Sequence, residues 1–156
     1  MDENDRKVFD NIEKYGCHVI YVFDTNEIYP PFTYSVGIQK SSNAPEVVVV
    51  GLKKEISAFI VNEYNRRVRE GEQFVTGKKY DGFLEGFEVF FEPVNECHYK
   101  EYFGYNIWLY GGHDFKVLQV VWPSTTGIWP WQEEASEWLR NNQPMLGNTP
   151  FAVDGL

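Results

Sequence analysis

Four consecutive valines, Val47–Val50, constrain the fold of this 156-residue chain more than any other feature of the sequence. They follow Glu46 and precede Gly51, so the run has the length of a strand and shows no polar alternation. A strand that is apolar on both faces is normally buried on both faces. The valine run therefore predicts a strand near the centre of a sheet that is covered on two sides.

The rest of the chain alternates between strand and helix patterns. Further strands are predicted at 17–24, 32–38, 86–93 and 115–122, and two short ones around a turn, at 73–75 and after Gly77. Helices are predicted at 3–15, 53–70, 95–110 and 132–140, and residues 39–45 are predicted to be a polar loop. In the helix at 53–70, one apolar stripe should face the core, and it consists of Ile56, Phe59, Ile60, Tyr64 and Val68.

These patterns favour one α+β domain over residues 1–156. We expect a largely antiparallel sheet, for which a split barrel is one form, with two or three packed helices. Residues 1–15 should hold an N-terminal helix, and residues 148–156 should be an irregular tail.

Charge is distributed unevenly along the chain, whose formal net charge is −9. Residues 1–79 contain 11 basic and 12 acidic side chains, whereas residues 80–156 contain 3 basic and 11 acidic ones. An acidic half repels phosphate backbones, which argues against nucleic-acid binding, and it attracts basic proteins. We expect either that this charge serves solubility or that the partner is a basic protein.

The sequence also bears on the cellular compartment. No apolar run reaches the roughly 20 residues that a membrane helix needs. The N-terminus, MDENDRKVFD, is polar and acidic, unlike a signal peptide. Two cysteines form no disulfide framework, which is typical of a reducing compartment. We expect a cytoplasmic protein without membrane contact, and the oligomeric state stays open.

Few residues have the spacing that chemistry requires. The pairs Cys17–His18 and Cys97–His98 are adjacent, whereas zinc ligands in a structural pair are usually separated by two or more residues. His113, after two glycines, is the most available general base, although an exposed turn histidine is the simpler interpretation. The carboxylate pairs Glu133–Glu134 and Glu88–Glu92 would suit a glycosidase only at a separation of about 5–9 Å. We predict no catalytic residue, metal or cofactor. A hydrolase remains a possibility beside the two functions considered below, a binding protein and a flavin-binding protein.

Residues 118–131 have the most unusual local composition, with LQVVWP followed by GIWPW. Proline restricts the backbone, so this loop could form a rigid lid over one end of the core. Tryptophan is also enriched at interface hot spots, so Trp129 and Trp131 could instead anchor a partner.

Six segments occur in an order and spacing that resembles the bacterial family named domain of unknown function 4262. They span residues 16–147 and are GCHVIYV (16–22), FTYSVGI (32–38), the stretch from Pro45-Glu46 to Gly51-Leu52, LQVVWP (118–123), GIWPW (127–131) and QPMLG (143–147). Members of the family often have a histidine before the Pro-Glu pair, where this chain has Ala44. That departure weakens any mechanism built on a histidine at this position.

The resemblance implies a function by association, because small acidic proteins of such bacterial families are often immunity proteins that neutralise a cognate toxin. The acidic half agrees with this function, since charge complementarity steers capture of a basic toxin. The protein would occlude the toxin's active site. The partner contacts predicted on this basis are Glu85, Glu88, Glu92, Glu96, Glu101, Asp114, Trp129 and Trp131.

A second resemblance concerns the fold. A strand ending in Ser-Val-Gly, a polar loop, a valine-rich strand and a helix resemble the start of flavin-reductase-type split barrels. That resemblance implies flavin mononucleotide at a dimer interface, with its phosphate near Lys40, Ser41, Ser42 and Asn43. Flavin absorbance of the purified protein would distinguish this alternative from a cofactor-free binding protein.

Overall fold

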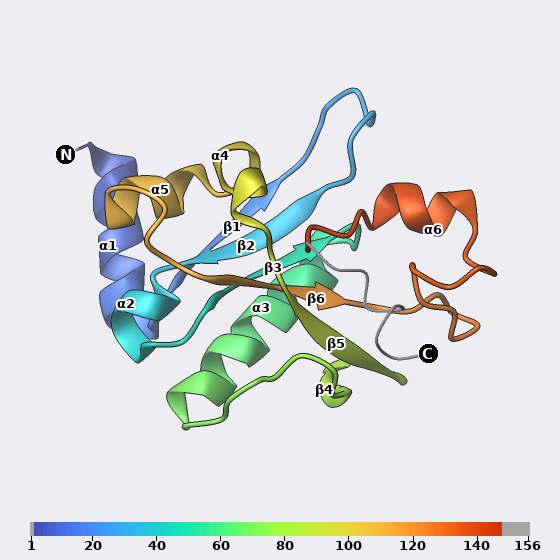
Figure 1. Ribbon diagram of the computed structural model, residues 1–156. Helices are drawn as coiled ribbons and strands as arrows, with labels where there is room; N and C mark the ends of the chain where they lie inside the picture. The colour runs from blue at the N-terminus through green and yellow to red at the C-terminus, as the bar shows by residue number, and fades with distance from the viewer. Residues whose placement is uncertain (1, 148–156) are drawn as a thin grey trace.

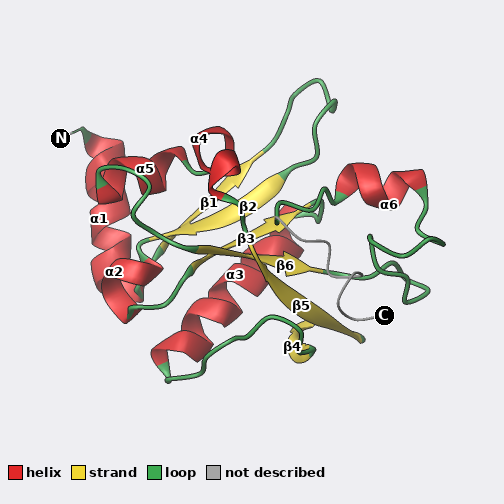
Figure 2. Cartoon of the chain, viewed as in Figure 1, coloured by secondary structure: helices red, strands yellow, loops and turns green. Residues whose placement is uncertain are grey.

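The computed structural model describes residues 2–147, and Figures 1 and 2 show how their helices and strands are arranged. The strands are β1 (His18–Val22), β2 (Phe32–Val36), β3 (Glu46–Val50), β4 (Tyr80–Leu84), β5 (Phe87–Pro93) and β6 (Val117–Val121). The helices are α1 (Glu3–Tyr15), α2 (Ile38–Ser42), α3 (Lys54–Arg69), α4 (Tyr99–Tyr102), α5 (Gly104–Tyr110) and α6 (Glu137–Asn142), with a 3₁₀ turn, η1 (Glu96–His98), before α4.

The six strands form one open sheet in the order β1-β2-β3-β6-β5-β4. Neighbouring strands are antiparallel except β3 and β6, which run parallel with Glu46 opposite Val117. The four valines of β3 are fully buried in the interior of the sheet. The α+β class, the single domain and the largely antiparallel sheet are confirmed. Within residues 2–147 the sheet is open, with β1 and β4 as its edge strands, whereas the sheet of a split barrel would close on itself.

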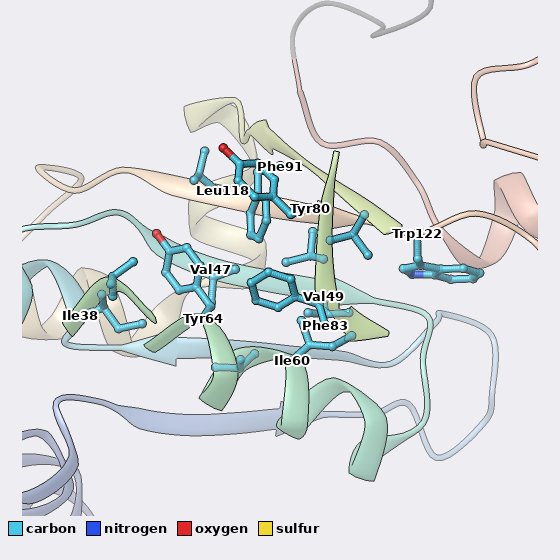
Figure 3. Packing of buried hydrophobic residues seen from close by; sticks show 14 of the residues in the cluster. Ile38, Val47, Val49, Ile60, Tyr64, Tyr80, Phe83, Phe91, Leu118 and Trp122 are labelled. Carbon is cyan, nitrogen blue, oxygen red and sulfur yellow. The ribbon is translucent and has the colours of Figure 1, made fainter. Parts of the chain in front are cut away.

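Each face of the sheet has its own core, and the valines of β3 alternate between the two. Val47 and Val49 pack with Ile60 and Tyr64 of α3, as Figure 3 shows. Val48 and Val50 belong to the opposite core, which is covered by α1, α4 and α5. This alternation is the direct consequence of the two-residue period of a strand.

Two buried glutamines, Gln119 and Gln143, connect residues 143–147 to β6 and Trp122 through side-chain hydrogen bonds. The Gln119 side chain donates to the carbonyl oxygen of Pro144 and accepts from the N–H of Leu146, both at 2.9 Å. Gln143 accepts from the backbone N–H of Trp122 at 2.8 Å and donates to its carbonyl oxygen at 2.7 Å. The segments LQVVWP and QPMLG therefore act as structural partners.

Several elements differ from the sequence predictions. The helix predicted at 95–110 is divided into η1, α4 and α5, because the backbone leaves the helical region at Phe103 (φ −119°, ψ 49°). The short helix α2 takes up residue 38 of the predicted strand and residues 39–42 of the predicted loop, and residues 73–75 form no strand. The described residues hold six α-helices, where four were predicted and two or three of them were expected to pack on the sheet; the additional ones are α2 and the second helix within 95–110.

The apolar stripe of α3 is only partly buried. Ile60, Tyr64 and Val68 lie in the core as predicted, but Ile56 and Phe59 are 39% and 56% exposed. The helix instead buries Ser57 and Val61, so its contact with the sheet is rotated away from Ile56 and Phe59.

Two further predictions concern the chain as a whole. Within residues 2–147, no helix has both the length and the apolar character needed to cross a bilayer. The predicted irregular tail at 148–156 lies outside the described residues.

Candidate protein-binding site

The structure separates the eight predicted contact residues into three places. Glu85 lies in the turn between β4 and β5 and Glu88 lies on β5, beside the loop after β6 that carries Trp129 and Trp131. Glu92 lies on β5, inside the protein. The remaining three are exposed around η1, α4 and the loop before β6, and they are Glu96, Glu101 and Asp114.

The first of these places contains a depression of about 630 Å³, which we call the acidic groove. Helix α3, the β4–β5 hairpin and the loop after β6 form its walls through Phe59, Leu84 and Trp129. The groove shares Phe59, Leu84 and Glu85 with a second hollow of about 470 Å³ that also includes Ile56. Three segments that lie far apart in the sequence thus build one continuous surface.

The tryptophan loop is held in one conformation by its own contacts. Ser124 donates its backbone N–H to the carbonyl oxygen of Ile128 at 2.7 Å, and its hydroxyl accepts from the Ile128 N–H at 3.0 Å. The rings of Trp129 and Trp131 are stacked with centroids 5.4 Å apart. Both rings meet Phe90 edge-on, with centroid distances of 4.7 and 5.6 Å. The wall of the groove is therefore formed before any partner arrives.

Carboxylates surround the apolar walls of the groove. Asp81, Glu85 and Glu88 line it, and Glu55 lines the adjoining hollow. Lys79 is the only basic residue among those that line the two hollows. The charge of this surface is therefore strongly negative, as a site for a basic partner requires.

Sequence reasoning missed Phe59, Ile56, Leu84 and Asp81 as members of this site. Phe59 and Ile56 were assigned to the core because they share the helical spacing of the buried residues. The apolar stripe of α3 was too wide to be buried completely, and this was the available signal. The helix buries Ser57 and Val61 and leaves Ile56 and Phe59 at the edge of the buried face.

Glu92 does not fit the predicted contact role, because its side chain is only 7% exposed. The backbone of Gly147 passes so close that an added Cβ there would lie 3.2 Å from Cγ of Glu92. The other acidic cluster stands apart from the groove, and its Glu96 carboxylate lies 3.3 Å from Nδ1 of His113. Of the predicted contacts, the groove therefore unites Glu85, Glu88 and Trp129, while Trp131 does not line it and instead stacks on Trp129.

Glu46 is a second unusual carboxylate, but it is buried. It accepts hydrogen bonds from the backbone N–H groups of Gly37, Ile38 and Gln39, at 3.0–3.2 Å, and from the Ser35 hydroxyl at 2.8 Å. The hydroxyl of Tyr110 donates a fifth bond at 2.5 Å. Burial raises the pKa of Glu46, and the donors oppose this rise. The carboxylate occupies the N-terminal amides of α2, which makes it a structural group.

The cysteines and histidines are dispersed. Burial raises the pKa of the Cys17 thiol to about 12, which makes it a poor nucleophile, and Cys97 is exposed. Burial lowers the pKa of His18, whose ring lies 2.9 Å from the side-chain nitrogen of Asn11. Within residues 2–147, no group of three His, Cys, Asp or Glu side chains is placed to hold a metal ion.

The residues proposed for a flavin phosphate lie at the wrong end of α2. Lys40, Ser41 and Ser42 form its last turn, and the Ser41 hydroxyl already donates to the carbonyl oxygen of Gly16 at 2.6 Å. Phosphate is favoured at the N-terminus of a helix, where Glu46 already accepts the amide hydrogens. These three residues, together with Asn43, therefore provide no support for a flavin site.

Comparison with known protein families gives a match, and the matched residues include those that form the groove. A family model described as Domain of unknown function (DUF4262) matches residues 11–136, which include α3, the β4–β5 hairpin and the tryptophan loop. No curated protein and no solved structure matches the chain.

Proposed function

The chain belongs to the family described as Domain of unknown function (DUF4262), and we propose that it is a binding protein whose acidic groove captures a basic protein. One observation carries the proposal: the carboxylates of Asp81, Glu85 and Glu88 surround the apolar surfaces of Phe59 and Trp129. Exposed aromatic residues provide contact area, and a rim of one charge selects the partner and accelerates encounter.

The exposure of Phe59 supports a binding role for this surface. A phenylalanine that is 56% exposed leaves more than half of its surface in water, and a partner that covered it would bury that apolar area. The preformed tryptophan loop also reduces the entropy lost on association. We therefore assign the centre of contact to Phe59 and Trp129, and the rim to the carboxylates.

The partner that we propose is a toxin of bacterial origin, which the protein neutralises by covering the active site. Two arguments support this choice. Active sites that act on phosphates are lined by basic residues, to which a carboxylate rim is complementary. A cofactor-free capture protein also needs no reactive group, and the groove presents contact residues without a nucleophile beside a base.

The experiment is co-expression with the proteins encoded beside this one. A toxic neighbour should be rescued by the wild-type chain, and Phe59→Ser should weaken the complex by about tenfold, which corresponds to about 1.4 kcal/mol. The matched control is Trp138→Ser, because Trp138 is 61% exposed on α6 and does not line the groove. If no neighbour is toxic, or if both substitutions weaken the complex equally, the proposal is wrong.

A further inference from the structure

The two edges of the sheet differ in how they are protected from pairing with another strand. At the β4 edge, the register is irregular between Tyr80 and Leu84, and Gly82 has a φ of +88°. An exposed Asp81 lies on the same strand. Bulges and charges of this kind are devices that prevent edge-to-edge association. The β4 edge is therefore closed to a further strand.

The β1 edge has none of these devices. Its sequence, HVIYV, contains no Asp, Glu, Lys, Arg, Gly or Pro, and all five residues pair in regular register with β2. Among residues 2–147, no strand pairs with its other side. Val22 and Phe23 are 36% and 61% exposed where the strand ends. A regular, uncharged edge strand is a template for a further strand.

The loop after β1 is held in place, so it could meet a partner without reordering. The carboxylate of Asp24 accepts from the backbone N–H groups of Asn26, Ile28 and Tyr29 at 3.0–3.1 Å. The rings of Tyr21 and Phe23 stack with centroids 5.7 Å apart. The exposed apolar side chains are therefore presented on a structured tip.

Charge around β1 indicates which partner fits. Asp24 and Glu27 make the tip of the strand acidic. Near its start lie Lys14, at the end of α1, and Arg69, which donates to the carbonyl oxygen of Tyr15 at 2.5 Å. If β1 of a second copy pairs antiparallel with β1, the acidic end of each strand lies beside the basic beginning of the other. The two-fold symmetry repeats this contact in both halves of the interface. Charge complementarity thus favours a second copy of this chain.

We propose that β1 pairs antiparallel with β1 of a second copy, with the two-fold axis at Ile20. Val19 then lies opposite Tyr21 of the partner subunit, a β-branched and aromatic pair that stabilises antiparallel strands. The two acidic halves stay apart, because the acidic groove is at the β4 edge, five strand spacings or about 24 Å from β1. The dimer presents one groove at each end.

Register-specific cross-linking tests this pairing, in a Cys97→Ser background that removes the exposed native thiol. Across the axis, Ile20 faces Ile20 of the partner subunit at a Cα separation of about 5 Å, which a disulfide can bridge. Val22 is about 13 Å from Val22 of the partner subunit. Mild oxidation should therefore link Ile20→Cys into a dimer and leave the matched Val22→Cys variant unlinked. Equal linking of both variants would overturn the register.

Sedimentation of the unmodified chain provides an independent test. A mass of twice 18.2 kDa should appear as concentration rises from about 1 μM to about 1 mM. Glu27→Lys and Lys14→Glu should each weaken the dimer at least threefold, and the double variant should restore it, because the charges are exchanged. Circular dichroism checks that each variant is folded. A chain that stays monomeric throughout this range, or single variants that leave the association unchanged, would overturn the proposal.

Discussion

Glu46 is a fully buried carboxylate whose five donors come from β2, α2 and α5 and from the turn at Gly37. A buried charge without such donors would cost several kcal/mol. In the sequence, Glu46 directly precedes the valine run of the predicted central strand. Its hydrogen bonds to the N-terminal amides of α2 and to Tyr110 of α5 connect both helices to the central strand β3.

Replacement of this carboxylate should reveal its role. Glu46→Gln should lower the free energy of unfolding by about 2 kcal/mol, because the new NH₂ group faces donors instead of accepting from them. The surface substitution Glu101→Gln should change it by less than about 0.5 kcal/mol. Urea unfolding measures both, and equal effects of the two would contradict the role assigned to Glu46.

The pH dependence of stability follows from the raised pKa of Glu46. Below its ordinary value of 4.5, the carboxyl is protonated in both folded and unfolded chains. Between 4.5 and the raised folded pKa, only the unfolded chain ionises, so wild-type stability falls as pH rises, and it levels off above the folded pKa. The unfolding free energy of wild type minus that of Glu46→Gln should therefore decrease across this window. An increase would show that the donors outweigh burial.

Trp129 should contribute both to the fold and to the groove. Its ring is half-buried against Phe90 and Trp131, so Trp129→Ala should cost about 2 kcal/mol, less than the 3–5 kcal/mol of a fully buried aromatic. The same change should accelerate dissociation of the partner. Thermal unfolding measures the change in stability, and binding kinetics with one partner immobilised on a surface measure the dissociation rate. An unchanged stability would mean that the stack does not support the loop.

At the scale of elements, the C-terminal segment is held by few but buried contacts. Residue 142 passes close to Gly51, at the end of β3. Gly51 has a φ of +93°, and the carbonyl oxygen of Asn142 is so close that a Cβ at this position would not fit. Trp122 donates its indole N–H to the carbonyl oxygen of Val50 at 2.8 Å. The end of β3, the end of β6 and residues 142–147 therefore form one unit.

Gln143→Ala should loosen this unit. The change leaves the buried N–H and carbonyl groups of Trp122 without their partner, which should cost about 2–4 kcal/mol. The neighbouring Asn141 is exposed, so Asn141→Ala is the matched control. Denaturant unfolding measures the stability, and limited proteolysis should cleave near residue 143 only in the first variant. If both variants resist cleavage, the glutamine is not what holds the segment.

At the scale of the whole molecule, the groove and the cluster around η1 are two separate groups of exposed acidic side chains. Both groups carry three exposed carboxylates, so the overall charge of the protein can be changed equally at either place. The groove should matter more, because charges farther than about 8 Å from the contact are screened at physiological ionic strength.

Neutralising each group in turn tests this difference. The groove variant should associate with a basic partner about tenfold more slowly at low salt and show a flatter salt dependence, whereas the control should retain most of the parental rate. Stopped-flow measurements over a range of salt concentrations compare the two. Equal slowing would show that net charge, and not the groove, steers the encounter. The groove variant is Asp81→Asn with Glu85→Gln and Glu88→Gln, and the control is Glu96→Gln with Glu101→Gln and Asp114→Asn.

The strands and the longest helices could be derived from the sequence because their signals are local. The valine run predicted a strand buried on both faces, and the periodicities of 3–15 and 53–70 predicted α1 and α3 to within about a turn. The stop signals Gly16 and Gly71 also act over a few residues. These elements form wherever the local pattern agrees with the core that they meet.

Only the tertiary structure decided what lies on the surface. The periodicity of α3 could not show that Ile56 and Phe59 remain exposed, because their burial depends on which strands pack against each side of the helix. For the same reason, Glu92 proved buried, while Glu85 and Trp129 came to share one groove. Helical spacing records which residues share a face of one element, but exposure depends on which other elements cover that face.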